Sequence, residues 1–170
     1  MMTLQRLRHS FLYSARLLLM MGLAGAGVLR AGDFVVEGTY AVHAMIGSGL
    51  GSSVGIFHVH RDGTLDGYAL VNLPTPDGTS RRTIRINVTG TVTVNEDGSG
   101  QAIYGGPLPD GTIGPPATED FVITKAERRG RSKILAVEIV DQREEPSILL
   151  GTAHEVRVTW NRLPDDGDEW

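Results

Sequence analysis

After residue 33, the chain alternates apolar and polar residues, and Asp-Gly or Gly/Pro clusters interrupt this alternation every eight to fifteen residues. No long stretch has helical periodicity, so the pattern predicts an all-β, antiparallel domain. The fourth of eight expected strands contains Gly90, which predicts a bend or bulge there. Residues 144–152 are either a short ninth strand or part of the last connection. The expected strands are 34–45, 53–61, 64–73, 81–95, 99–105, 118–128, 132–142 and 152–162.

Two similar stretches, "HVHRDGTLDG" at 58–67 and "TVNEDGSGQA" at 93–102, predict the pairing of their strands. Each fits a type I turn followed by a Gly with positive φ, which gives a three-residue hairpin loop with a bulge. This register places Phe57 opposite Gly67 and keeps the apolar residues on one face. A two-residue loop is the rival, and it would pair Val59 with Asp66 and mix the two faces.

The second stretch, treated in the same way, pairs Val92 with Ala102 and Gly90 with Tyr104. One hairpin design used twice in one sheet indicates a meander of consecutive strands. Closing the meander removes the exposed sheet edges. The sequence therefore predicts an antiparallel, up-and-down, eight-stranded barrel.

Three motifs carry a resemblance to a known group of proteins: "GTY" at 38–40, "RDGTLDG" at 61–67 and "GTVTVNEDGSG" at 90–100. Across about residues 34–106 the chain resembles small exported bacterial proteins with lipocalin-like or allene-oxide-cyclase-like barrels. The resemblance implies this architecture and export. It implies no catalytic residue, because the group has no shared catalytic motif.

The N-terminus has the composition of a secretory signal peptide. Arg6, Arg8 and Arg16 precede or flank a short apolar run, no acid interrupts it, and small residues follow at Ala24–Ala26. A membrane anchor is the alternative, but the apolar run is shorter than the about 20 residues that span a bilayer. The expected organisation is a signal peptide at 1–26, a short leader at 27–33, the barrel at 34–162 and an acidic tail at 163–170.

The composition excludes several kinds of function. The chain has no Cys, which excludes disulfides, thiolate metal sites and a cysteine nucleophile. Loss of residues 1–26 removes three Arg and takes the formal net charge from −4 to −7, which disfavours nucleic acid as a partner. The outward positions of the expected fourth strand are polar, so we expect that the mature chain is not embedded in a membrane. Together with the signal peptide, this predicts a secreted or periplasmic protein. The oligomeric state is left open.

The aromatic residues supply the candidate binding site. On the predicted alternation, Tyr40, Phe57, Tyr104 and Trp160 point into the barrel. An eight-stranded interior is either filled by side chains or holds one small ligand, and both alternatives stay open. We expect an exported barrel that binds a small apolar or amphipathic ligand without a cofactor. The alternative is a cofactor-independent cyclase or isomerase that folds a reactive substrate within the aromatic cavity.

Histidines and carboxylates supply further candidate sites. If the first hairpin centres on "IGSGLGSS" at 46–53, His43 lies opposite His58, and these side chains form an outer cluster with His60 and Asp66. We expect this cluster to be a solvated face without a metal. The carboxylates are expected in turns and the tail, with Glu138 alone in mid-strand and no interior pair. The Pro-rich segment 105–120 is expected to be a long loop, either a lid or a plain surface excursion.

The signal-peptide interpretation predicts a mature protein that begins near Gly27 or Gly32, the second start corresponding to cleavage after Ala31. The expected mass of the native, exported protein is that of the shortened chain, as measured by intact-protein mass spectrometry. Native protein that keeps Met1 would contradict this expectation.

Overall fold

The structure is a computed structural model, and it describes residues 34–47, 49–75, 77–130, 132–146 and 153–164. The expected signal peptide and leader and most of the acidic tail lie outside these residues. The described residues contain nine strands and no helix. The strands are β1 (Phe34–Val35), β2 (Gly38–Ile46), β3 (Gly51–Val59), β4 (Thr64–Pro74), β5 (Arg81–Val94), β6 (Ser99–Gly105), β7 (Ala117–Arg129), β8 (Lys133–Pro146) and β9 (Ala153–Arg162).

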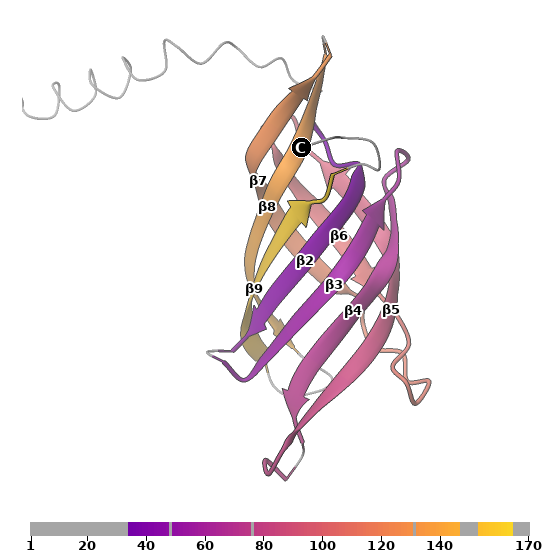
Figure 1. The fold of residues 1–170 in the computed structure, drawn as a ribbon, viewed down its shortest axis with the longest axis vertical. Helices are drawn as coiled ribbons and strands as arrows, with labels where there is room; N and C mark the ends of the chain where they lie inside the picture. Colours follow the sequence, from indigo (N-terminus) through magenta and orange to yellow (C-terminus); the bar gives the residue numbers. More distant parts are fainter. Residues whose placement is uncertain (1–33, 48, 76, 131, 147–152, 165–170) are drawn as a thin grey trace, which may run out of the picture. The chain divides into compact units, whose positions relative to one another are not determined.

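Strands β2 to β9 form a closed antiparallel barrel in which each strand pairs with its neighbours along the chain (Figure 1). The barrel closes because β9 pairs with β8 on one side and with β2 on the other. The prediction of an eight-stranded, up-and-down barrel is confirmed.

Three details differ from the sequence-based expectation. The first expected strand, 34–45, is divided in two, and Gly38 begins β2 with φ +113°. The short β1 pairs in parallel with β8, with Phe34 opposite Ile134. Of the bend or bulge expected at Gly90, the bulge is wrong, because the pairing of β5 runs without a register shift into both β4 and β6.

At Gly90, a Cβ atom would lie 2.1 Å from the carbonyl oxygen of Ile103, so close strand approach explains this glycine. The register irregularity lies instead in β7, between Ile123 and Ala126. Strand β8 continues to Pro146, so part of the suggested ninth piece extends β8, and residues 147–152 lie outside the description.

The predicted hairpin registers are confirmed. Val59 pairs with Leu65, Phe57 pairs with Gly67, and Gly90 pairs with Tyr104. Gly63 and Gly98 have φ angles of 81° and 82°, as the bulged turn requires.

The sequence Asp-Gly-Ser/Thr occurs in four turns of the described residues, and the turn at Asp77 closes one residue later than the others, from the Thr75 N–H to the Ser80 carbonyl oxygen. In each turn the Asp carboxylate accepts the backbone N–H two residues further on, which fixes the turn locally. These N–H groups belong to Thr64, Thr79, Ser99 and Thr112, with N···O distances of 3.0, 3.2, 2.9 and 2.9 Å.

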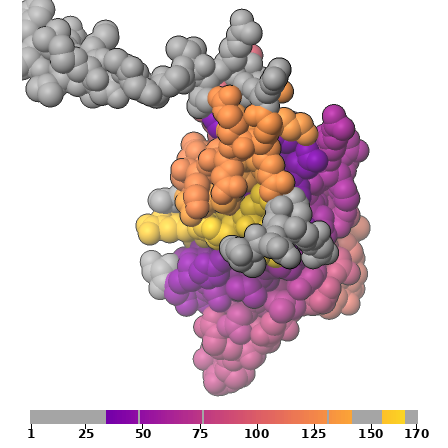
Figure 2. Space-filling model, turned by 45° about the horizontal axis from the view of Figure 1, so that its top comes forward, coloured from indigo at the N-terminus to yellow at the C-terminus, as the bar shows by residue number. Residues whose placement is uncertain are grey.

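One end of the barrel is covered by the N-terminal part of the domain. The Phe34 ring of β1 lies beside Gly98 in the β5–β6 turn, where a Cβ atom would be 3.4 Å from it, and Val36 is buried in the core. Lys133 Nζ lies 3.4 Å from Glu37 Oε2, and the Arg162 Nε donates to the Glu37 carbonyl oxygen at 3.2 Å. In Figure 2 the atoms of the β7–β8 hairpin, in orange, lie over this end next to those of β2 and β3.

The Asp-Gly turns predict a loss of stability in acid. The hydroxyl of Thr75, and then the Thr79 side chain and backbone, lower the pKa of Asp77 from 3.8 to about 2. Because the pKa is lower in the folded state, the stabilisation is complete above about pH 4 and is lost as the pH falls towards about 2. Replacing Asp77 with Asn should reduce the decline in the free energy of unfolding over this window, as measured by urea denaturation at a series of pH values. Glu96→Gln, which removes an exposed turn carboxylate, is the control, and an unchanged acid profile in D77N would contradict the assignment.

Candidate functional site: the aromatic interior and its carboxylates

The four aromatic side chains expected in the interior come together there, on β2, β3, β6 and β9. Trp160 is the hub, with ring centroids 6.0 Å from Tyr40, 5.2 Å from Phe57 and 6.4 Å from Tyr104. Phe57 and Tyr104 lie 5.1 Å apart, and all four contacts are edge-to-face, the geometry that aromatic pairs prefer. Phe121 of β7 adds a fifth ring at 6.5 Å from Trp160.

The four rings differ in their exposure. Tyr40, Phe57 and Trp160 are 0, 2 and 1% exposed, so these three pack against their neighbours. Tyr104 keeps part of its surface exposed while it packs against the same core. The buried rings of Tyr40, Phe57 and Trp160 therefore form a packed layer, which we call the floor of the site, and Tyr104 lies at its edge.

A buried carboxylate joins this cluster. Glu119 of β7 is 0% exposed and accepts hydrogen bonds from the Tyr104 hydroxyl on one oxygen and from the Trp160 indole N–H on the other, the latter at 3.1 Å. The Tyr40 hydroxyl donates to the Ala136 carbonyl oxygen at 2.9 Å. The polar groups of all three residues are thus bonded inside the barrel.

A second buried carboxylate lies on the adjacent strand. Asp141 of β8 is 3% exposed and pairs with Phe121 and Val158, two inward-facing residues. The expectation that Glu138 alone lies in mid-strand, without interior carboxylates, is therefore wrong. Glu138 instead accepts a hydrogen bond from the Thr124 hydroxyl at 2.6 Å.

The misplacement of these two acids has a physical reason. Asp141 becomes a mid-strand residue because β8 continues to Pro146. Glu119 shares the inward face with Phe121 and Ile123, and this two-residue alternation is the signal that could have identified it.

The other half of the interior is partly reached by solvent. The pairing of β2 to β5 determines which of their residues face inward. Many of these inward-facing residues are partly exposed, although the barrel is closed. This half therefore opens at the end that carries the β2–β3, β4–β5 and β6–β7 connections. The partly exposed inward positions include Ser53, Gly55, Ala69, Ile84 and Ile86.

The Pro-rich connection stands at this open end, between Tyr104 on β6 and Glu119 on β7. Residues 106–116 fold as a small hairpin, with Pro107 bridged to Ile113 and the Leu108 N–H donating to the Thr112 carbonyl oxygen at 2.9 Å. The Thr112 backbone N–H is the main cause of the lowered pKa of Asp110, and the positive charge of Arg82 on β5 adds to it.

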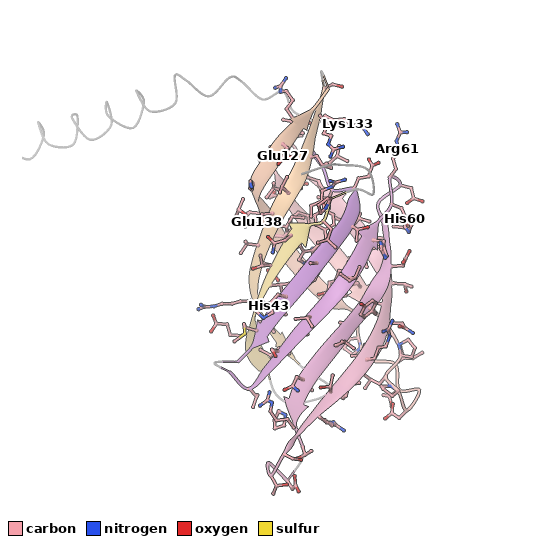
Figure 3. All side chains as sticks on the ribbon, in the orientation of Figure 1. His43, His60, Arg61, Glu127, Lys133 and Glu138 are labelled. Carbon is pink, nitrogen blue, oxygen red and sulfur yellow. The ribbon has the colours of Figure 1, made fainter. Side chains whose placement is uncertain are left out.

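The expected histidine cluster forms only in part, because Asp66 lies opposite His58 as predicted but His43 does not. The β2–β3 connection is shorter than assumed, so His43 pairs with Val54, and His58 pairs with Thr39. His43 and His60 lie well apart on the barrel (Figure 3). His60 Nε2 lies 2.6 Å from Asp66 Oδ2, while the His58 ring forms a hydrogen bond of 3.0 Å with the Thr39 hydroxyl. In the described part of the chain, no group of three or more His, Asp or Glu side chains could hold a metal ion.

Comparison with known proteins gives one structural likeness. No protein-family model and no curated protein matches the sequence. The solved structure of EF1p2_mFAP2b bound to DFHBI is similar, with 16% sequence identity, a TM-score of 0.46, and coverage of 75% of this chain and 94% of that chain. Among the described residues, no helix has the length and apolar character needed to cross a membrane.

Removal of the Glu119 carboxylate should destabilise the barrel. Glu119→Ala leaves the Tyr104 hydroxyl and the Trp160 N–H without this acceptor, and a buried donor without a partner costs about 1–3 kcal/mol. The expected loss in the free energy of unfolding is at least about 2 kcal/mol, as measured by urea denaturation. Glu119→Gln keeps an acceptor oxygen and should lose less, and Glu138→Gln on the outer side is the control. Equal losses in all three variants would contradict the role of Glu119 as the shared acceptor.

Proposed function

We propose that the barrel binds a small apolar or amphipathic molecule in the open half of its interior. The observation that carries the proposal is the partial exposure of inward-facing residues on β3, β4 and β5 and of Tyr104, next to rings that are fully buried. A concave, mainly apolar site with a few fixed polar groups is the usual form of a small-molecule site. In this site Tyr104 contacts the ligand, while Tyr40, Phe57 and Trp160 shape the floor.

The construction of the site favours binding without large rearrangement. Trp160 is held by edge-to-face contacts with Tyr40 and Phe57 and by its hydrogen bond to Glu119. A ligand that meets such a floor loses its own freedom but does not have to order the protein, and this lowers the cost of association. Each apolar Å² removed from water contributes about 25 cal/mol.

We propose further that the protein works outside the cytoplasm as a lipocalin-like carrier. The basic and apolar N-terminus supports export, and the motifs at 38–40, 61–67 and 90–100 support the resemblance to small exported barrels. A site built from apolar surface and neutral aromatic groups needs no cofactor for binding.

A second candidate function is a cyclase or isomerase activity, and the contact between Tyr104 and Glu119 favours it. A phenol that is partly exposed and hydrogen-bonded to a buried carboxylate can take part in proton transfer at the wall of an apolar site. The two functions share one site, so they differ in whether the bound molecule is changed.

Binding should be visible through Trp160. With Trp170 replaced by Phe, the remaining tryptophan lies in the floor of the site, and limonene or menthol should shift its emission in a saturable titration. Ala69→Leu adds bulk at a partly exposed inward position and should weaken binding by about tenfold or more, because overpacking costs about 1–3 kcal/mol.

Ala41→Leu is the matched control, since Ala41 lies in the outward phase of β2, opposite Ile56 and Asn161. This variant should bind as the parent does. If neither probe changes the emission, or if both variants respond equally, interior binding fails. Recovery of a chemically altered probe would favour the enzymatic alternative.

A further inference from the structure

We infer that the molecule bound in the barrel is an amphiphile with an anionic head, such as a carboxylic acid with one apolar chain, and that Arg82 at the open end holds this head. This inference rests on the proposed function, because it names the class of molecule that the same site would select. It follows from the place of Arg82 in the inward-facing row of β5.

Arg82 occupies an inward position near the start of β5. It pairs with Leu73 of β4, which is 1% exposed and belongs to the inward face. Residues directly opposite each other on antiparallel strands share one face of the sheet, so Arg82 begins the inward row of β5 although its side chain is exposed. The inward positions that follow it are Ile84, Ile86, Val88, Gly90, Val92 and Val94.

Arg82 differs from its surroundings in charge. Strands β2 to β5 are described over their full length, and every other inward position on these four strands is uncharged. An Arg at the edge of an apolar surface can lay its methylene groups on that surface while its guanidinium stays in water. The wall of the barrel therefore runs from a positive charge at the open end to apolar side chains further in, a gradient that matches an anionic amphiphile.

The chemistry of this row suits a carboxylate head. The guanidinium keeps its charge at all ordinary pH values and carries five N–H donors in a planar fork, which matches the two oxygens of a carboxylate. Ile84 and Ile86 follow at about 7 and 14 Å along the strand and are partly exposed. An apolar chain attached to the head would contact both residues on its way towards the aromatic floor.

The head is expected at the open end and not deep in the barrel. A charged group that enters the interior loses its water, which costs free energy unless the charge is paired. Arg82 offers this pairing where solvent still reaches the site. The acidic residues Glu119 and Asp141 are 0 and 3% exposed and offer an anion no positive charge.

The Pro-rich hairpin brings a carboxylate to the same end. It projects there together with the β4–β5 hairpin (Figure 1). Hydrogen bonds from Thr112 are the main cause of the lowered pKa of Asp110, and the positive charge of Arg82 adds to them. The Asp110 carboxylate accepts the Thr112 N–H at 2.9 Å within its own turn. Because a nearby negative charge offsets part of the attraction of Arg82 for another anion, Asp110 should weaken binding of the head.

The inference is tested at neutral pH with three probes that share one apolar chain: octanoate, 1-octanol and octylammonium. Calorimetric titration should show octanoate binding about three- to fivefold more tightly than octanol, and octylammonium binding most weakly. Since Arg82 is exposed, the preference for octanoate should shrink when NaCl is raised to 1 M.

Three variants assign the preference to Arg82. Arg82→Gln should abolish it and leave the affinity for octanol unchanged. Arg85→Gln is the matched control, because it removes the same charge from the outward face of the same strand, where the guanidinium lies 3.9 Å from the centroid of the Tyr68 ring. Asp110→Asn should tighten octanoate binding about twofold without affecting octanol, a gain that a merely structural effect on the open end would not produce.

The possible results separate the two proposals. If the three probes bind equally well, if octylammonium binds most tightly, or if Arg82→Gln and Arg85→Gln change the order equally, the inference is wrong while binding in the interior stands. If no probe binds at all, both the inference and the proposed function are wrong. A preference for octanoate that is lost in Arg82→Gln alone and strengthened in Asp110→Asn supports both.

Discussion

The closure of the sheet by β9 is the constraint on which the interior depends. β9 pairs with β2 along one edge and with β8 along the other, so it removes both open edges of the meander at once. The same strand carries Trp160, whose ring meets Tyr40 of β2 and Phe57 of β3. The hydrogen bond from Trp160 to Glu119 then connects β9 across the interior to β7. Closure of the barrel and assembly of the aromatic core therefore depend on the same strand.

The barrel is asymmetric along its length, and this asymmetry determines where a ligand can enter. At one end β1 pairs with β8, Phe34 packs beside the Gly98 turn and Val36 joins the core. Large rings fill the adjoining part of the interior. Towards the other end, small residues such as Gly55 and Ala69 face inward and are partly exposed. The aromatic rings thus gather in one half, and the partly exposed inward positions lie towards the end that carries the Pro-rich hairpin.

Turn sequences and the alternation of apolar and polar residues predicted those parts of the structure that depend on neighbouring residues in the chain. The Asp-Gly turns fixed the registers of two hairpins, because the turn type sets which residues face each other. The alternation that follows from those registers placed Tyr40, Phe57, Tyr104 and Trp160 inside. The β2–β3 pairing was mispredicted because the glycine-rich connection contains no such turn signal, and its loop occupies only residues 47–50. The parallel pairing of β1 could not be read from a two-residue strand.

Glu119 was missed for a different reason, since its place depends on partners that are 15 and 41 residues away along the chain. An acidic residue within an alternating apolar and polar strand is predicted to face solvent, unless the groups that donate hydrogen bonds to it are known. For packing alone, an apolar side chain of similar volume would serve as well as or better than a buried charge. What the carboxylate adds is orientation, because it takes the single proton of Tyr104 and that of Trp160 and so decides which way each polar group faces. The physical effect of Glu119 is therefore to fix the orientation of Tyr104 and Trp160, and its contribution to the fold follows from the same two bonds.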